Sequence, residues 1–288
     1  MNGRYETISR RVLRVLAAAA ILVAGIVIGA TLPFPESQKE ATPQPARRAA
    51  GEEKSSPATQ PVSLLPLDRP QLLLAFAAAA DASANGKPPP ASNASLVGRS
   101  FILRLPFGCD GPSADLASAW AGWTYDPKTR ALKLQAQPEV WGEAPWIKSI
   151  AGETPFEAVE GFWIRRPWTN AETCPSTRSE TPTTRTGDFS ERQTIGVAQF
   201  FAPGGPRTLR RGSRPYAVTL RVDEEMEAKP HTYHLLISGR IVGFDDGQPI
   251  HCRNEADNLR PVCLISVEFN RVAFVDADDG SNLSEWHN

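Results

Sequence analysis

The sequence is poor in the residues and motifs from which many enzymes build their active sites. Its 288 residues include four histidines and four cysteines. They contain no G-x-S-x-G nucleophile motif, no P-loop and no H-E-x-x-H zinc motif. These absences argue against the corresponding hydrolase, nucleotide-binding and metalloprotease families. We predict no catalytic residues, metal or cofactor, although a catalytic triad, being defined by geometry, stays open.

The chain also lacks an excess of charge of either sign, since its formal net charge is −1. This balance argues against a globally basic nucleic-acid-binding protein, so we expect no nucleic-acid partner. One local cluster is basic, with four guanidinium groups within eight residues at Arg207, Arg210, Arg211 and Arg214. This loop is a candidate surface for an envelope protein or for an anionic polymer or lipid. The alternative is a solvated connection.

One long apolar run predicts a membrane anchor. Residues 15–32 carry no charge, and extension back to residue 12 gives about 21 residues, long enough to cross a bilayer. Four arginines and one glutamate precede the run, so the positive-inside rule places the N-terminus in the cytoplasm. We therefore predict a cytoplasmic tail at 1–11 and a transmembrane signal-anchor at 12–32 in the inner membrane. The remainder of the chain is then periplasmic.

A cleaved signal peptide is the alternative to the anchor, and it would give a secreted or periplasmic protein. Ile28-Gly29-Ala30 supplies only one of the two small residues of a cleavage site, and the apolar run is longer than usual. If the helix is retained, Gly25 and Gly29 form a G-x-x-x-G spacing that allows two helices to pack closely. A homodimer through the transmembrane helix is therefore possible.

Residues 33–98 are predicted to be a Pro/Ala-rich linker. Eight prolines fall between positions 33 and 70, a composition typical of an extended tether. The linker includes one short helix at about 70–84. Asp68 is a suitable N-cap, Pro70 lies in the first turn and Gly86 follows the end. Because this helix is almost entirely apolar, we expect it to dock on the domain or on a partner.

Residues 99–288 are predicted to form an exported, mainly β domain, an antiparallel sandwich or barrel with a few short helices. Apolar and polar residues alternate in four segments, at Phe101–Leu105, Leu132–Ala136, Tyr216–Val222 and Cys263–Phe269. Asp246-Gly247 predicts a hairpin. Capping and glycine signals predict three short helical segments, at Pro112–Ala121, Thr154–Gly161 and Asn282–Trp286.

All four cysteines, Cys109, Cys174, Cys252 and Cys263, fall in this exported domain. An even number of cysteines in an oxidising compartment predicts two disulfides. Cys252 and Cys263 flank a polar, turn-rich segment between two strands, so they are the expected local pair, and Cys109 with Cys174 follows by elimination. Zinc binding is disfavoured because no C-x-x-C or C-x-x-H spacing occurs.

Six of the seven tryptophans lie within 49 residues, at Trp120, Trp123, Trp141, Trp146, Trp163 and Trp168. On a β surface they would form a platform for sugar rings, and in a core they would fill volume. The order of tail, anchor, tether and β domain is similar to that of bitopic envelope adaptors of Gram-negative bacteria. We therefore expect an envelope interaction or scaffolding module. The alternatives are an exported enzyme acting on an envelope polymer and a non-catalytic glycan-binding module.

Overall fold

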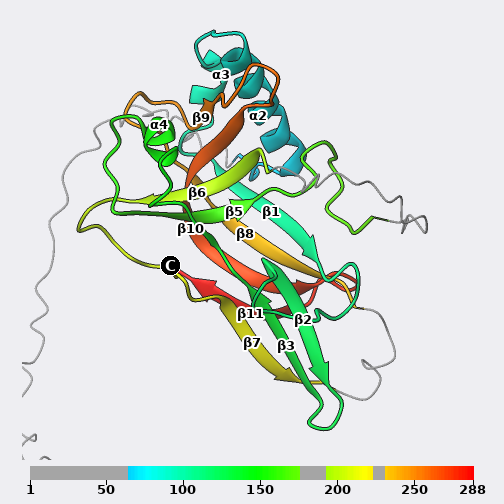
Figure 1. The fold of residues 1–288 in the computed structure, drawn as a ribbon. Helices are drawn as coiled ribbons and strands as arrows, with labels where there is room; N and C mark the ends of the chain where they lie inside the picture. Colours follow the sequence, from blue (N-terminus) through cyan, green and yellow to red (C-terminus); the bar gives the residue numbers. More distant parts are fainter. Residues whose placement is uncertain (1–63, 176–192, 223–230) are drawn as a thin grey trace, which may run out of the picture. The chain divides into compact units, whose positions relative to one another are not determined.

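The fold is taken from a computed structural model, which describes residues 64–175, 193–222 and 231–288. These residues form a mainly β domain with two sheets and few helices, as predicted (Figure 1). The predicted tail and anchor, with Gly25 and Gly29, lie outside the described residues. None of the helices in the described ranges combines the length and apolar character needed to cross a membrane.

The larger sheet has eight strands. Its main path runs β1 (Ser100–Phe107), β8 (Tyr233–Ile241), β10 (Val262–Asp276), β6 (Ile195–Phe201), β5 (Ala158–Trp163) and β4 (Glu139–Val140). Two further strands, β9 (Ile250–Arg253) and β11 (Asn282–His287), pair with β10. The 15-residue strand β10 therefore organises this sheet.

One strand pair departs from the predicted antiparallel arrangement. Strand β10 pairs with β6 in parallel over Cys263–Ser266, whereas its pairings with β8, β9 and β11 are antiparallel. A parallel pair requires a long crossover instead of a tight turn. The segments between β6 and β10, which include β7, β8 and β9, provide that crossover.

Asp246-Gly247 lies in the predicted turn, which two hydrogen bonds close as a tight hairpin loop, but the strands on either side of it do not pair with each other. The amide of Phe244 donates to the carbonyl of Gln248 at 2.9 Å. The amide of Gly247 donates to the carbonyl of Phe244 at 2.8 Å, and Gly247 has a positive φ of 79°. The flanking strands β8 and β9 both pair with β10 and not with each other. The turn therefore connects β8 and β9, which pair with different parts of the long strand β10.

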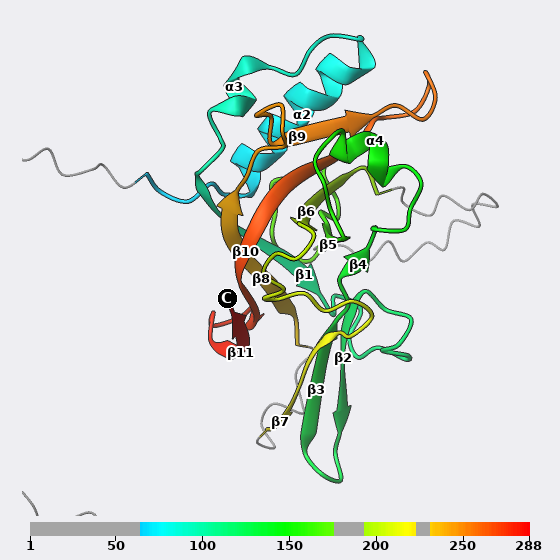
Figure 2. The same ribbon diagram turned by 90° about the vertical axis from the view of Figure 1, so that its left-hand side faces the viewer.

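The smaller sheet consists of three antiparallel strands, β2 (Ala121–Asp126), β3 (Ala131–Ala136) and β7 (Tyr216–Arg221). In β3, Leu132 and Leu134 are buried while Lys133 between them is exposed, as period-two alternation requires. The two sheets share one hydrophobic cluster that also includes residues of α2. Figure 2 shows the smaller sheet beside the lower ends of β1 and β8.

Helix α2 (Arg69–Ala84) matches the helix predicted at about 70–84. The side chain of Asp68 accepts a hydrogen bond from the amide of Gln71 at 3.1 Å, which completes a capping box. Leu72 and Phe76 are buried in the main cluster, and the helix packs on β1, β9 and β10. This helix, which the sequence analysis assigned to the linker, is thus part of the packed domain. The other described helices are α3 (Ala91–Ala94) and α4 (Ile147–Ala151).

Arg69 fixes the start of α2 to a distant loop. Its Nε donates to the carbonyl of Thr169 at 3.0 Å, and its Nη2 donates to the carbonyls of Arg165 and Arg166 at 2.7 and 2.9 Å. Burial lowers the pKa of the guanidinium, while the charge of Glu172 opposes that shift. The buried arginine therefore acts as a structural crosslink between residues about 100 positions apart.

The three short helical segments predicted within the domain are wrong. No α-helix forms at Pro112–Ala121, because the amide of Ser113 donates instead to the carbonyl of Trp123 in β2 at 2.8 Å. A local capping pattern is worth only about 1 kcal/mol. Sheet pairing that buries large side chains outweighs it.

The same competition decides the other two segments. At Thr154–Gly161 the amide of Glu157 donates to the carbonyl of Phe201 at 2.8 Å, and strand β5 follows immediately. Asn282–Trp286 lies in β11, where Trp286 is the register partner of Val272 in β10. Both segments satisfy their backbone groups through the larger sheet.

Candidate interaction surfaces

Two disulfides link the domain, and both predicted pairs are confirmed. Cys109 is bonded to Cys174, and Cys252 to Cys263, with Cα–Cα distances of 5.5 and 4.0 Å. Cys252 and Cys263 are direct register partners in β9 and β10, so this disulfide closes the loop between the two strands. None of the four thiols is free. Disulfides of this kind are typical of an extracytoplasmic, oxidising compartment.

Three of the tryptophans form one compact cluster on the larger sheet. The ring centroid of Trp141 lies 4.9 Å from that of Trp163 and 6.4 Å from that of Trp146. The rings lie close to the strands because Gly161 and Gly196 lack side chains. A Cβ at Gly196 would lie 3.1 Å from Trp163 and 3.3 Å from Trp141. These three tryptophans therefore fill a core around α4.

The other three tryptophans lie elsewhere. Trp123 is buried with its ring centroid 5.9 Å from that of Tyr233, and Trp120 packs against Phe107 at 6.4 Å. Only Trp168 among the six is largely exposed, at 62%. The six residues thus do not share one exposed row of rings.

The Arg207–Arg214 segment is held against the domain by two carboxylates of its own chain. Arg207 and Arg210 both form ion pairs with Glu157, with Arg207 Nε at 3.0 Å from Oε1. The hydrogen bond from Arg207 is the main cause that lowers the pKa of Glu157 below its ordinary value of 4.5. Arg207 remains 66% exposed, so its pair with Glu157 is a surface contact.

Glu160 provides the stronger anchor for the same segment. Its side chain is 5% exposed and accepts the backbone amides of Arg211 at 2.7 Å and Gly212 at 2.9 Å. Arg210 Nε lies 3.7 Å from the same carboxylate. A buried carboxylate is tolerated only when it is paired and hydrogen-bonded, and these three groups meet that requirement.

The remaining arginines also contact the domain. Arg211 stacks over Tyr216 at 4.9 Å and donates to the carbonyl of Pro215 at 2.7 Å. Burial raises the pKa of the Tyr216 hydroxyl, which donates to the carbonyl of Leu209 at 2.8 Å. Arg214 is exposed and makes a long contact, 3.5 Å, to the carbonyl of Arg211. The guanidinium groups are therefore largely committed to intramolecular contacts.

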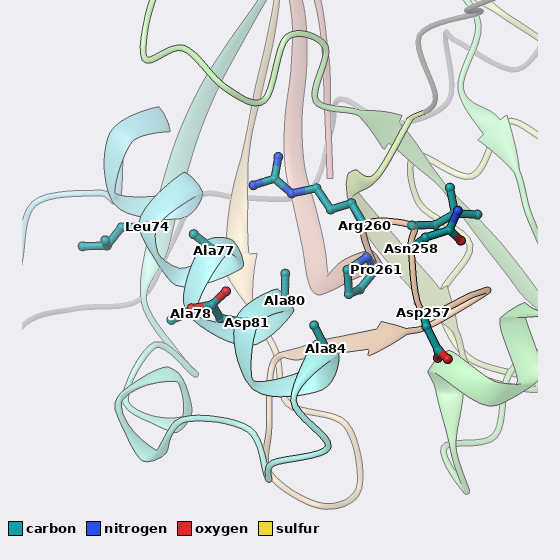
Figure 3. A pocket seen from close by; sticks show the side chains of 11 residues that line it. Leu74, Ala77, Ala78, Ala80, Asp81, Ala84, Asp257, Asn258, Arg260 and Pro261 are labelled. Atoms are coloured by element: carbon teal, nitrogen blue, oxygen red, sulfur yellow. The ribbon is translucent and has the colours of Figure 1, made fainter.

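A surface that the sequence analysis did not identify lies beside α2. A groove of about 550 Å³ runs between α2 and the β9–β10 loop (residues 254–261), and we call it the α2 groove (Figure 3). Ser83 in α2 and Asn254 in the loop exchange two hydrogen bonds, of 3.2 and 2.9 Å. These bonds and the Cys252–Cys263 disulfide hold the wall of the groove against the helix.

The α2 groove is lined by small apolar residues with charges at its edge. Figure 3 shows Ala77, Ala80 and Ala84 along the helix, with Arg260 and Pro261 on the opposite loop. The helix is apolar on all sides, which normally indicates a helix that is buried all round. Its outer face is nevertheless exposed. The continuous apolar run of Leu72–Ala80, with no polar face, is the sequence signal that could have indicated this surface.

The outer face of α2 carries the most exposed large apolar side chain of any described helix. Leu74 is 73% exposed, and Leu259 on the facing loop is 39% exposed. Asp81 and Asp257 supply negative charge at the same site, and Arg260 supplies positive charge. This combination of apolar floor and charged rim resembles a protein-binding surface more than a small-molecule pocket.

His251 makes specific polar contacts through both nitrogens of its ring. Its Nδ1 lies 2.6 Å from the carbonyl of Ile150, and its Nε2 lies 3.1 Å from Asp246 Oδ2. The ring also stacks on Phe244 with centroids 4.0 Å apart. With both nitrogens engaged, His251 is a structural residue. No cluster of three or more potential metal ligands occurs among the described residues.

Comparison of the chain with protein-family models, with curated proteins and with solved structures finds no match. Its fold and contacts define a disulfide-linked, mainly β domain with an apolar groove beside α2.

Proposed function

We propose that this chain is a single-pass inner-membrane protein whose β-rich domain is a periplasmic interaction or scaffolding module of the cell envelope. The observation that carries the proposal is the exposed apolar face of α2 beside the α2 groove. A soluble domain gains stability by covering such a face, and a helix packing into an apolar groove is a common recognition mode. The two disulfides support an extracytoplasmic location.

The alternatives have less support. A glycan-binding platform requires several exposed rings in one row, and Trp123 and Trp141 are buried. An enzyme acting on an envelope polymer requires a polar cleft with a nucleophile or an acid–base pair. The α2 groove offers Asp81, Asp257 and Arg260 around an alanine floor, an arrangement suited to docking.

Site-specific photocrosslinking of the full chain in intact cells tests the binding surface. A photoreactive residue at Ala77 in the groove is compared with one at Val140, which is also exposed but lies on β4. We expect a defined protein adduct from position 77 and only background from position 140. Equal labelling at both positions would remove the groove as the binding surface.

The location is tested separately with a reporter that is active only in the periplasm, fused after Asn288. We expect reporter activity together with a full-length protein in the membrane fraction. A mature N-terminus near Ala30 would contradict the anchor and indicate a secreted domain. An inactive reporter would contradict the export of the domain.

A further inference from the structure

The α2 groove has the features of a surface that binds itself. Leu74 projects from the outer face of α2, and the small side chains of Ala77, Ala78 and Ala84 follow it along the same helix. One helix face therefore carries both a protruding leucine and the small alanines on which the leucine of another copy could pack. In an antiparallel pair of such helices, each leucine packs on the alanines of the other copy.

The charges at the groove also allow the surface to pair with a second copy of itself. Asp81 on the helix and Arg260 on the loop form no ion pair with any described residue. Asp81 lies on the helix beside Ala78 and Arg260 on the facing loop, with Asp257 farther along that loop toward Ala84 (Figure 3). A twofold rotation about an axis near Ala78 reverses the helix direction and brings the acid of each copy toward the arginine of the other. The surface is thus complementary to itself in charge as well as in shape.

We propose that the occupant of the α2 groove is a second copy of this chain, with two α2 helices packed antiparallel about a twofold axis near Ala78. This inference rests on the proposed function and names its partner. An isologous contact buries the same residues on both copies. Formation of the dimer would therefore cover Leu74 of both chains. The axis places Asp81 of one copy beside Arg260 of the partner copy.

If the predicted membrane anchor is retained, it would help so small a surface to hold a dimer. One helix face and one loop bury much less than the roughly 1,600 Å² typical of stable complexes. Confinement of separate chains to one membrane would raise their local concentration and so favour contacts that are weak in solution. The G-x-x-x-G spacing at Gly25 and Gly29 would raise this concentration further.

Single cysteines in the full chain test the proposal in intact cells, because all four native cysteines are disulfide-bonded. Ala78→Cys lies at the proposed axis, Gln71→Cys and Asn85→Cys lie toward the ends of the helix, and Val140→Cys is the remote control. For an antiparallel pair we expect about tenfold more disulfide-linked dimer from Ala78→Cys than from Val140→Cys, with less at both ends of α2. Equal linkage at all three helix positions would contradict the antiparallel arrangement.

Charge reversal in the Ala78→Cys chain provides the specificity control. Asp81→Arg alone and Arg260→Asp alone should each reduce the dimer band several-fold, and the two together should restore it. If Asp81 and Arg260 do not face each other across the two copies, the double variant will not restore the dimer band. An adduct of Ala78→Cys with a different protein, and no dimer, would overturn the self-association but leave the interaction module intact. No adduct there of any kind, together with background photolabelling at Ala77, would overturn both.

Discussion

The Arg207–Arg214 segment and helix α2 contact the rest of the domain in opposite ways. The arginine segment carries four charges, yet Glu157, Glu160 and nearby carbonyls hold most of them within the domain. Helix α2 carries almost no charge, yet one of its faces has no covering partner among the described residues. Most guanidinium groups of the charged segment contact the domain, although Arg211 Nε is buried without a hydrogen-bond partner, whereas one face of the apolar helix is uncovered among the described residues.

This difference shows that a binding surface is better recognised by its unsatisfied groups than by its composition. A guanidinium that already has a carboxylate partner gives up that contact before it can bind another anion, which offsets part of the gain. An exposed leucine on an alanine floor gives up only water when it is covered. The proposed interaction surface therefore lies at α2, while the arginine segment mainly contacts its own domain.

The largest expected effect separates the two faces of α2. Phe76 is fully buried, so Phe76→Ala should lower the free energy of unfolding by about 4 kcal/mol. Leu74→Ala, on the exposed face of the same helix, should change it by less than about 0.5 kcal/mol. Urea denaturation of the purified full chain measures both. A cost above about 2 kcal/mol for Leu74→Ala that does not change with protein concentration would show that Leu74 is buried within one chain.

The next effect tests the anchoring of the arginine segment. Glu160→Ala removes the buried acceptor of the Arg211 and Gly212 amides, and we expect a loss of about 3 kcal/mol in the free energy of unfolding. Glu160→Gln keeps one acceptor oxygen and should cost less. Arg210→Glu would likewise place a third carboxylate beside Glu157 and Glu160, so it tests stability before it tests any ligand. A change below about 0.5 kcal/mol for Glu160→Ala would contradict the anchor.

Strong local patterns were sufficient for part of the fold. The capping box at Asp68 predicted α2, and strict alternation predicted β3, in which only one face is buried. The polar loop between Cys252 and Cys263 predicted their disulfide, because a short loop keeps its ends close together. Each of these features depends on residues that are near one another in the sequence.

Features that depend on distant residues could not be predicted. Strands β5, β6 and β8 are covered on both faces and so show no alternation. Glu160 lies in the middle of β5, and only the distant amides of Arg211 and Gly212 explain its burial. The α2 groove requires the β9–β10 loop, which lies about 170 residues from the helix along the chain. Long-range pairing, not local propensity, creates all three.

The smallest effect concerns pH and the exposed part of the arginine segment. Hydrogen bonding from Arg207 lowers the pKa of Glu157 below 4.5 in the folded chain, while the unfolded carboxyl keeps its ordinary value. Its contribution to stability is therefore fully present above pH 4.5 and is lost as the pH falls through the lower, folded-state pKa. We expect Glu157→Gln to be slightly less stable than the parent at neutral pH, and the difference to vanish in strong acid.

Thermal unfolding of the parent and of Glu157→Gln across this pH range measures that difference. Glu153→Gln, on the same exposed loop, is the control for the loss of one negative charge. Repeating the comparison in the Arg207→Gln background should shrink the pH-dependent part, because the donor chiefly responsible for the lowered pKa of Glu157 is then absent. A difference that persists unchanged in acid would mean that Glu157 contributes through packing and not through its charge. The pairing of the arginine segment would then rest on Glu160 alone.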